Sequence, residues 1–192
     1  MRYLVGFAFV MLAVAAFRIV GCGETQDIGE WGTAQRIDSD QEAGAGAPSV
    51  AIDPRGNAIA VWVEAHGRDV VGYGVWANRF TAPEGWGPAE RIDASEEAEA
   101  LGPDVAMDPD GNALAVWRLW NAEGDPSDTF WASRFTSSDG WQTAGRIEHN
   151  DQGSSGNPRI AVDSQGNAIA VWPQWSETRE NVWSNRFTPT NG

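Results

Sequence analysis

One cassette occurs three times in this chain, and its copies account for nearly everything after residue 30. The copies begin at Trp31, Trp86 and Trp141, at a period of about 55 residues. Each copy opens with W-x-x-A-x-R-I-[DE], continues through P-x-[VI]-A-[IMV]-D-x-x-G-N-A-[IL]-A-V-W and closes with W-[AS]-[NS]-R-F-T. Self-similarity at a period of roughly 20–50 residues is typical of solenoids and propellers. The repeat therefore constrains the fold far more than it constrains the activity.

Each cassette contains four short segments of β-type sequence that are separated by turn signals. In the first copy they are Ala34–Ile37, Ser49–Asp53, Asn57–Trp62 and Val75–Thr81. Between the second and third segments, Asp53–Asn57 combines Asp, Pro and Gly in the order that favours a tight hairpin turn. The run Ala58–Trp62 is apolar on both faces, which predicts a strand that is covered on both sides.

The segment P-S-V-A-I-D-P-R-G-N-A-I-A-V-W, at Pro48–Trp62, resembles the core of NHL-type and related bacterial β-propeller repeats. The other two copies carry the same segment. The resemblance implies an all-β fold with three four-stranded antiparallel blades. In that order Pro48–Asp53 is the innermost strand, Asn57–Trp62 the second and Val75–Thr81 the third. The outermost strand is Ala89–Ile92, which already belongs to the next cassette.

This phase leaves both ends of the array incomplete. The chain opens with a lone outermost strand at Ala34–Ile37 and stops after a third strand at Val182–Thr188. Closed propellers usually have about four to eight blades, so three blades do not make a ring. Two interpretations remain. The three blades are an open arc or a fragment of a longer array, or two chains exchange their lone strands as a homodimer and close a six-bladed ring.

The N-terminal segment predicts export and a lipid anchor. Arg2 precedes a short apolar run at Tyr3–Phe17, which is typical of a signal peptide rather than a membrane span. Ile19-Val20-Gly21-Cys22 resembles the bacterial lipobox, and Cys22 is the only cysteine. The resemblance implies lipidation of Cys22, and Gly23 after it implies delivery to the outer membrane of a diderm bacterium. The predicted organisation is a signal peptide at 1–21, a lipidated cysteine and tether at 22–30, and β-propeller repeats at 31–192, divided into 31–85, 86–140 and 141–192.

Charge and loop positions indicate where a partner binds. The formal net charge is −14, which repels phosphate backbones and argues against a nucleic-acid partner. The variable connections, among them Val63–Gly74, Arg118–Thr129 and Pro173–Asn181, fall on one rim, where a rigid frame most often carries function. Trp120 and Trp175 lie three residues beyond the tryptophan that ends the second strand, at the position of Ala65. They are the candidate ligand-binding residues, although packing over the blade edge would also explain them.

The remaining recurrent residues are expected to be structural. Trp62, Trp76, Trp117, Trp131, Trp172 and Trp183 are predicted to lie in the core. Arg36, Arg91 and Arg146, and likewise Arg79, Arg134 and Arg186, are predicted to pair with carboxylates on neighbouring strands.

The sequence favours a binding protein over an enzyme. His66 and His149 fall in loops of different copies and form no metal-spacing pair, so neither a metal site nor a cofactor is predicted. Asp108-x-Asp110-x-Asn112 only superficially resembles a calcium loop, because the central Asp is not repeated. The expected function is a non-enzymatic, lipid-anchored cell-envelope module that binds a protein through one loop rim. Lectin-like glycan binding and a hydrolase or lyase on a propeller frame are the alternatives.

Overall fold

The computed structural model describes residues 30–39, 44–65, 72–93, 99–120, 128–149 and 153–189. Within these ranges there are strands, turns and extended segments, and no helix of the length and hydropathy needed to cross a membrane. The predicted signal peptide at 1–21, Cys22 and all but the last residue of the tether lie outside the described residues. Residues 1–34 and 35–192 are two separate units, and all the blades belong to the second.

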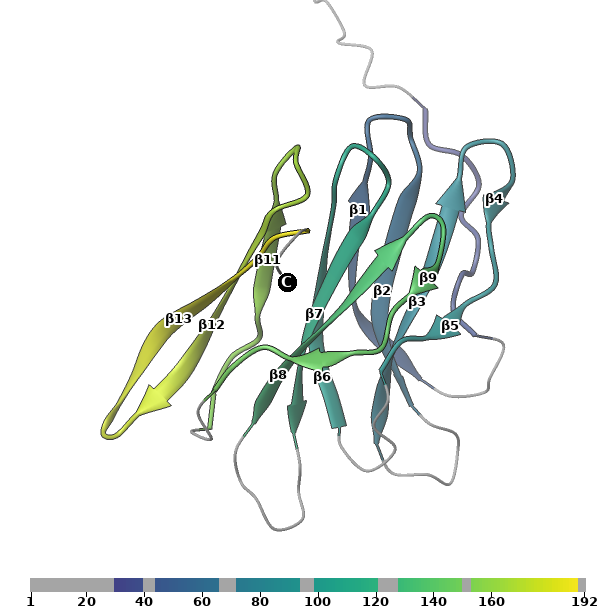
Figure 1. Ribbon diagram of the computed structural model, residues 1–192. Coiled ribbons are helices and arrows are strands. Elements are labelled where there is room, and N and C mark those ends of the chain that lie inside the picture. The colour runs from purple at the N-terminus through teal and green to yellow at the C-terminus, as the bar shows by residue number, and fades with distance from the viewer. Residues whose placement is uncertain are drawn as a thin grey trace, which may run out of the picture. The chain divides into compact units, whose positions relative to one another are not determined.

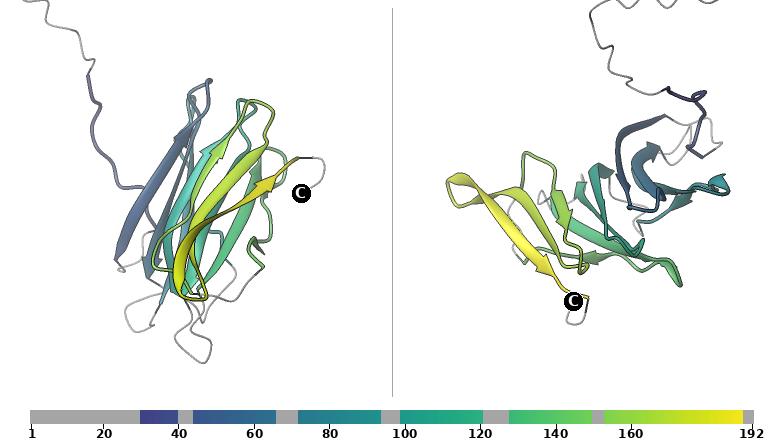
Figure 2. Two further views of the ribbon diagram at one scale, coloured as in Figure 1. Left: turned by 90° about the vertical axis from the view of Figure 1, so that its left-hand side faces the viewer. Right: turned by 90° about the horizontal axis from the view of Figure 1, so that it is seen from above.

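The three cassettes form three antiparallel sheets, which stand side by side as blades (Figures 1 and 2). The first blade contains β1 (Ala45–Ile52), β2 (Ala58–Ala65), β3 (Tyr73–Thr81), β4 (Gly85–Trp86) and β5 (Glu90–Arg91). The second contains β6 (Glu99–Met107), β7 (Ala113–Trp120), β8 (Thr129–Thr136), β9 (Gly140–Trp141) and β10 (Gly145–Arg146). The third contains β11 (Arg159–Val162), β12 (Ala168–Ser176) and β13 (Arg179–Phe187). The predicted all-β propeller-like array is confirmed.

The prediction that the outermost strand of each blade comes from the next cassette is also confirmed for the first two blades. The outermost position beside β3 is taken by β5, with Arg91 opposite Trp76, although β5 belongs to the second cassette. In the same way β10 pairs with β8. The prediction of a strand at Ala34–Ile37 is wrong, because these residues are not hydrogen-bonded into any sheet. In the described part of the chain no blade precedes β1, so this segment has no strand edge to join.

The core lies between the blades. Every residue of β2 from Ala58 to Glu64 is buried, as a strand that is apolar on both faces requires. Ile59 and Val61 of the first blade pack in one cluster with Ala115 and Trp117 of the second. A smaller cluster joins the second blade to the third. The facing surfaces of neighbouring blades thus cover each other.

The tryptophans of the cassette divide into two groups. Those of the second strands are buried, as predicted: Trp62, Trp117 and Trp172. Those of the third strands are only partly buried in the first two blades, at Trp76 and Trp131. Trp183 of β13 is exposed, which contradicts the core prediction, because no further described strand covers β13.

A carboxylate organises the tight turn between the first and second strands of every blade. Asp108 Oδ1 accepts the backbone N–H groups of Asp110 and Asn112, each at 2.9 Å, and its Oδ2 accepts Asn112 Nδ2 at 2.8 Å. Asp53 and Asp163 make the same bonds in their own blades. Burial raises the pKa of Asp53, but the hydrogen bonds from Asn57 and Arg55 outweigh it and hold that pKa below its ordinary value. These oxygens are used by the turn, so the loop does not have the free ligands of a calcium site.

The same turns bring neighbouring blades together. Gly111 has a φ of 86°, which side chains rarely adopt, and a Cβ on it would lie 3.4 Å from Asp53 Oδ2 of the preceding blade. A Cβ added to Gly166 would likewise lie 3.2 Å from Asp108 Oδ2 of the preceding blade. The backbone conformation of the turn therefore favours glycine in every blade, with a φ of 84°, 86° and 79° at Gly56, Gly111 and Gly166, and at Gly166 an added Cβ would also crowd the blade before it.

Asp104 of β6 joins the innermost strands of all three blades. Its Oδ1 accepts Ser49 Oγ of β1 at 2.8 Å, and its Oδ2 accepts the backbone N–H of Ile160 in β11 at 3.0 Å. Arg159 of β11 lies beside the same carboxylate, at 3.8 Å. One side chain thus ties the middle blade to both neighbours near the inner edge of the array.

The ion pairs given for the recurrent arginines of the outermost segments lie within one segment of the described chain, not between strands as predicted. Arg91 pairs with Asp93 in its own segment at 2.7 Å, and Arg146 pairs with Glu148 in the same way. The third-strand arginines instead reach the next blade. Arg79 lies over the ring of Phe135, and Arg134 lies over the ring of Phe187, each at 5.6 Å from the ring centroid. A cation–π contact therefore recurs at both interfaces between blades.

The predicted long loop at Pro173–Asn181 is wrong. Here β12 continues to Ser176 and β13 begins at Arg179, and Pro173 pairs with Val182. Glu177 takes a φ of 57°, which closes the strands into a tight hairpin.

We expect Asp108→Ala to lower the free energy of unfolding by about 2 kcal/mol, because three hydrogen bonds to one carboxylate are lost. Asp110→Ala is the matched control, since its side chain is exposed and faces only Arg55, at 3.6 Å. That change should cost no more than about 0.5 kcal/mol. Urea denaturation followed by tryptophan fluorescence measures both values. Equal losses in the two variants would contradict the role of Asp108.

Candidate functional site

The two tryptophans that the sequence singles out lie at the same rim of the array. Trp120 is the last residue of β7, and Trp175 is the next-to-last residue of β12. Their side chains are 43% and 41% exposed. Trp120 remains exposed although a further blade follows its own, so packing between blades does not bury its ring. Both residues are available to a ligand at this rim.

The first blade presents an aromatic residue at the same level, but from the other strand of the hairpin. Ala65 stands where the other blades have Trp120 and Trp175, and Tyr73 lies directly opposite it in β3. Tyr73 is 38% exposed. Tyr73 was not predicted as a site residue, although the register of the β2–β3 hairpin places it opposite Ala65. Each blade therefore carries one half-exposed aromatic side chain at this rim.

Carboxylates occupy the position of Tyr73 in the second and third blades. Asp128 Oδ2 accepts the backbone N–H of Ser154 at 3.1 Å and lies 3.5 Å from Arg118 Nη1. Glu180 accepts the Oγ of Ser155 at 2.7 Å and its backbone N–H at 2.9 Å. These two hydrogen bonds hold the pKa of Glu180 below its ordinary value. Two neighbouring residues of one loop are thus held by two different blades.

That loop, Gly153–Gly156, connects the two tryptophan positions. The carbonyl oxygen of Gly153 accepts the backbone N–H of Trp175 at 3.0 Å. Gly156 lies so close to Pro173 that an added Cβ would be 2.5 Å from its Cγ. We call Trp120, Asp128, the loop Gly153–Gly156, Trp175 and Glu180 the rim site. It combines flat aromatic faces with hydroxyl, carboxylate and backbone polar groups on a fixed loop.

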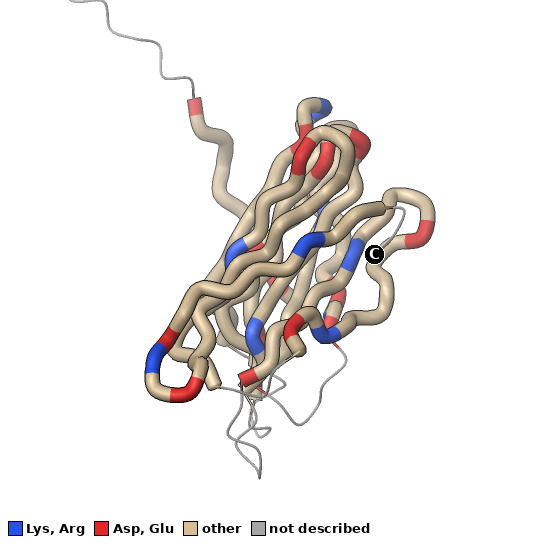
Figure 3. The backbone as a smooth tube through the Cα atoms, turned by 60° about the vertical axis from the view of Figure 1, so that its left-hand side comes forward, with Lys and Arg blue, Asp and Glu red and all other residues tan. Residues whose placement is uncertain are grey.

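The acidic and basic residues are distributed differently. Figure 3 shows acidic residues gathered in turns at both ends of the blades and basic residues along the strands between them. Asp125 and most of the acidic runs at Asp38–Glu42 and Glu96–Glu99 lie outside the described residues.

The buried carboxylates are held by structural hydrogen bonds. Glu64 accepts Trp62 Nε1 at 2.9 Å and also accepts Ser39 Oγ. Asp93 and Glu148 accept the backbone N–H groups of Val75 and Phe130, at 3.1 Å and 3.0 Å. These three carboxylates therefore accept hydrogen bonds from the protein itself, and these bonds orient the strands.

Metal-ligating residues do not gather in the described ranges. No group of three His, Cys, Asp or Glu side chains that could hold a metal ion occurs there. His149 is exposed, and His66 lies outside the described residues.

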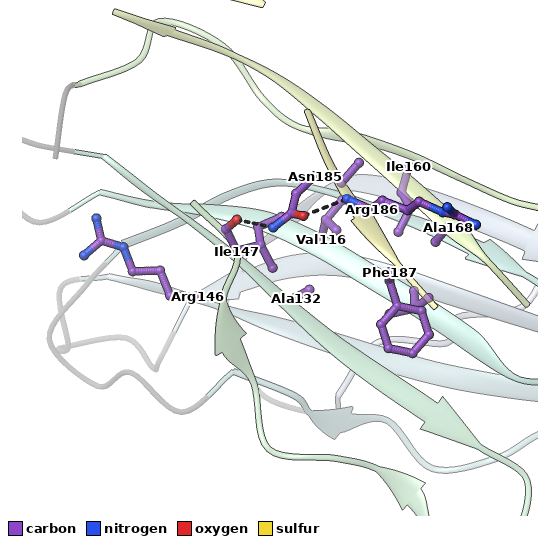
Figure 4. A pocket seen from close by; sticks show the side chains of 11 residues that line it. Val116, Ala132, Arg146, Ile147, Ile160, Ala168, Asn185, Arg186 and Phe187 are labelled. Carbon is purple, nitrogen blue, oxygen red and sulfur yellow. Dashed lines mark hydrogen bonds between the residues drawn. The ribbon is translucent and has the colours of Figure 1, made fainter. Parts of the chain in front are cut away.

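A cleft of about 240 Å³ lies between the second and third blades (Figure 4). Its walls are mainly apolar and include Val116, Ala132 and Ile160. At its edge Asn185 Nδ2 donates to the carbonyl oxygen of Ile147 at 2.7 Å. The residues that line it include no carboxylate, histidine or cysteine. We assign this cleft to packing between blades and not to a ligand.

Comparison with known proteins supports the fold alone. No family model matches the chain, and no curated protein matches it. Among solved structures, a Hadza microbial sialidase matches with a TM-score of 0.57 and 10% identity, over 79% of this chain and 36% of the sialidase. A protein of unknown function from Dyadobacter fermentans matches with a TM-score of 0.54 and 14% identity, over 78% of this chain and 52% of the other.

A Bacillus subtilis levansucrase, solved in complex with oligosaccharides, matches with a TM-score of 0.53 and 11% identity. The match covers 77% of this chain and 45% of the levansucrase. The chain thus spans about half or less of the length of each of these three structures. The shared feature is the propeller-like frame.

We expect Trp62→Phe to destabilise the fold by about 1–2 kcal/mol more than Trp117→Phe, because only Trp62 donates a hydrogen bond to a buried carboxylate. Trp117 Nε1 is buried and has no hydrogen-bond partner, since Leu119 stands where Glu64 stands in the first blade. Both changes remove the same ring volume, so each variant controls for the other. Urea denaturation gives the two free energies, and equal losses would show that the bond to Glu64 contributes nothing.

Proposed function

We propose that this chain is a non-catalytic binding module that takes a carbohydrate at the rim site. The observation that carries the proposal is the exposure of Trp120 on a rigid strand end, beside a loop fixed by Asp128 and Glu180. An indole ring offers a flat apolar face that suits the C–H face of a sugar ring. The exposed Ser155 and Glu180 beside the loop suit the sugar hydroxyl groups, which both donate and accept hydrogen bonds.

Two further considerations favour a glycan. The tryptophans are separate and flanked by polar groups, whereas a protein-docking surface at this rim would need a broader apolar centre. Two of the matched structures are a sialidase and a levansucrase solved in complex with oligosaccharides, so a saccharide is a reasonable first class of ligand to test. The NHL-type resemblance remains a prediction about the repeat and adds nothing about the ligand.

A non-catalytic role is favoured by the way the carboxylates are used. Glycoside hydrolysis needs two carboxyl groups that face one glycosidic bond. Here Glu64, Asp93 and Glu148 are buried and hydrogen-bonded to strands, and Asp128 and Glu180 each hold a loop backbone. The alternative of a hydrolase or lyase therefore rests on the shared frame alone.

We further propose that the module is held at the outer membrane by a lipid on Cys22. The support is the short apolar run before it and the likeness of Ile19–Cys22 to a lipobox. A lipid anchor followed by the short tether at 22–30 would keep the rim site close to the cell envelope, where polysaccharides are abundant ligands.

We expect Trp120→Ala to weaken binding to a polysaccharide by about tenfold or more, which corresponds to about 1.4 kcal/mol. Affinity electrophoresis in gels that contain levan, dextran, xylan or a sialylated glycan measures the retardation. Trp183→Ala is the matched control, because Trp183 is equally exposed, at 40%, but lies in the middle of β13. Retardation by none of the glycans, or equal loss in the two variants, would overturn the proposal.

We expect Cys22→Ser to abolish incorporation of labelled palmitate and to release the protein from the membrane fraction of a diderm bacterial host. The hydroxyl cannot form the thioether on which lipoprotein processing depends. Gly23→Ser keeps the cysteine and should keep the label. Persistence of the label in Cys22→Ser would contradict lipidation at this residue.

A further inference from the structure

The outer face of the third blade is apolar and uncovered. Ile169, Val171 and Val182 are 54%, 37% and 80% exposed on this face. The residues at the same positions of the first blade are buried against the second blade and are no more than 1% exposed: Ile59, Val61 and Val75. The repeat itself therefore shows what covers such a face, namely the innermost and second strands of a following blade.

The innermost strand of the first blade is uncovered on the opposite face. Val50 and Ile52 of β1 are 66% and 68% exposed, whereas Val105, at the position of Val50 in β6, is 6% exposed. One end of the array thus exposes the front half of an interface, and the other end exposes the back half. The complete interface occurs twice within the chain, between the first and second blades and between the second and third.

Two specific contacts of that interface also lack one partner at each end. Arg79 and Arg134 lie over the phenylalanine rings of the next blade, while Arg186 has no following blade among the described residues and Phe80 has no preceding one. In the turns, Gly111 and Gly166 approach an aspartate of the preceding blade. Gly56 has no atom within 4 Å of an added Cβ, so its place for a preceding turn is open.

The segment Gln35–Asp38 has the contacts of an outermost strand whose blade is missing. The carbonyl oxygen of Ile37 accepts Asn78 Nδ2 at 2.9 Å, just as the carbonyl oxygen of Ile147, which follows outer strand β10, accepts Asn185 Nδ2 at 2.7 Å. In the third blade this contact joins the outermost segment of the preceding blade to β13, whereas in the second blade the equivalent Ser133 donates to the carbonyl oxygen of Gln142 in its own blade. Gln35–Asp38 therefore lies where the edge of a blade before β1 would lie.

The third blade, in contrast, has no outermost strand among the described residues. In the first two blades the residue after the outer strand donates its N–H at 2.8 Å, from Ile92 to Val75 and from Ile147 to Phe130. The acid that follows accepts the N–H of that same third-strand residue. At Val182 of β13, which has the position of Val75, no described segment supplies either group.

We propose that the missing cover is a second copy of this chain, and that two copies exchange their Gln35–Asp38 segments to close a ring of six blades. In the register of the first two blades, Gln35 lies opposite Ser184 and Arg36 opposite Trp183 of the other copy. The carboxylate of Asp38 accepts the N–H of Val182. Arg186 lies over Phe80 of the other copy, and Asp163 meets Gly56. Six blades fall within the usual range, and a two-fold axis satisfies both uncovered ends at once.

The first test is the mass of the full chain, purified in mild detergent and measured by light scattering with the detergent contribution subtracted. We expect a dimer for the native chain and a monomer for Val182→Arg, whose side chain is already exposed and should not disturb the fold of one copy. Ser137→Arg adds the same charge in an exposed turn away from both faces and should stay a dimer. A monomeric native chain overturns the proposal and leaves further blades of a longer polypeptide as the cover.

The second test locates the exchanged strand. With Cys22 replaced by serine, the pair Gln35→Cys and Ser184→Cys should form a disulfide-linked dimer under mild oxidation, seen on a non-reducing gel. The control pair Gln35→Cys and Ala132→Cys should not, because Gly145 of β10 already lies opposite Ala132. A dimer of the correct mass in which the first pair forms no disulfide would refute the strand exchange. Glycan binding at Trp120 is independent of both results, so failure here does not affect the proposed function.

Discussion

The structure depends on one constraint, which is that a strand with two apolar faces must be covered on both sides. In β2 the chain places Ile59 and Val61 on one face and Ala60 and Trp62 on the other, and all four are buried. A single sheet cannot bury its own two faces. One face of β2 is covered by the second blade, and on the other face the segment with Ile37 and Ser39 bonds to Asn78 and Glu64. The repeat therefore stacks, and its hydrophobic core lies between blades.

The sequence was sufficient to predict what depends on local pattern. The period follows from comparing the three copies, the Asp-centred turn from residues within one cassette, and the strand order from the resemblance to NHL-type repeats. Contacts between cassettes were not predictable in the same way. Arg79 was expected to pair with a carboxylate, but the stacking of blades places it over Phe135, and only the three-dimensional offset between blades shows this. The hairpin at Glu177 was missed because a positive φ at a non-glycine residue has no clear sequence signal.

The candidate site was predicted in part, and the reason is informative. Trp120 and Trp175 stood out because they break the pattern of the cassette at the position of Ala65. Tyr73 was missed because it breaks no pattern on its own strand, and its relation to Ala65 appears only in the register of the hairpin. The roles of Asp128 and Glu180 depend on a loop from another part of the cassette. A site of this kind combines residues that differ between the repeats, such as Trp120, with residues that fix the neighbouring loop, such as Asp128 and Glu180.

The link made by Asp104 has a consequence for how such a chain can change. The three cassettes look like copies of one unit, yet at this position they carry Ser49, Asp104 and Arg159, and the central carboxylate binds groups from both neighbours. Exchanging the middle cassette with either neighbour would place the carboxylate in an end blade, where it would lose one of these two neighbours. The three cassettes are therefore not interchangeable at the inner edge of the array, and adding, removing or reordering a single blade would break a contact on which its neighbours depend.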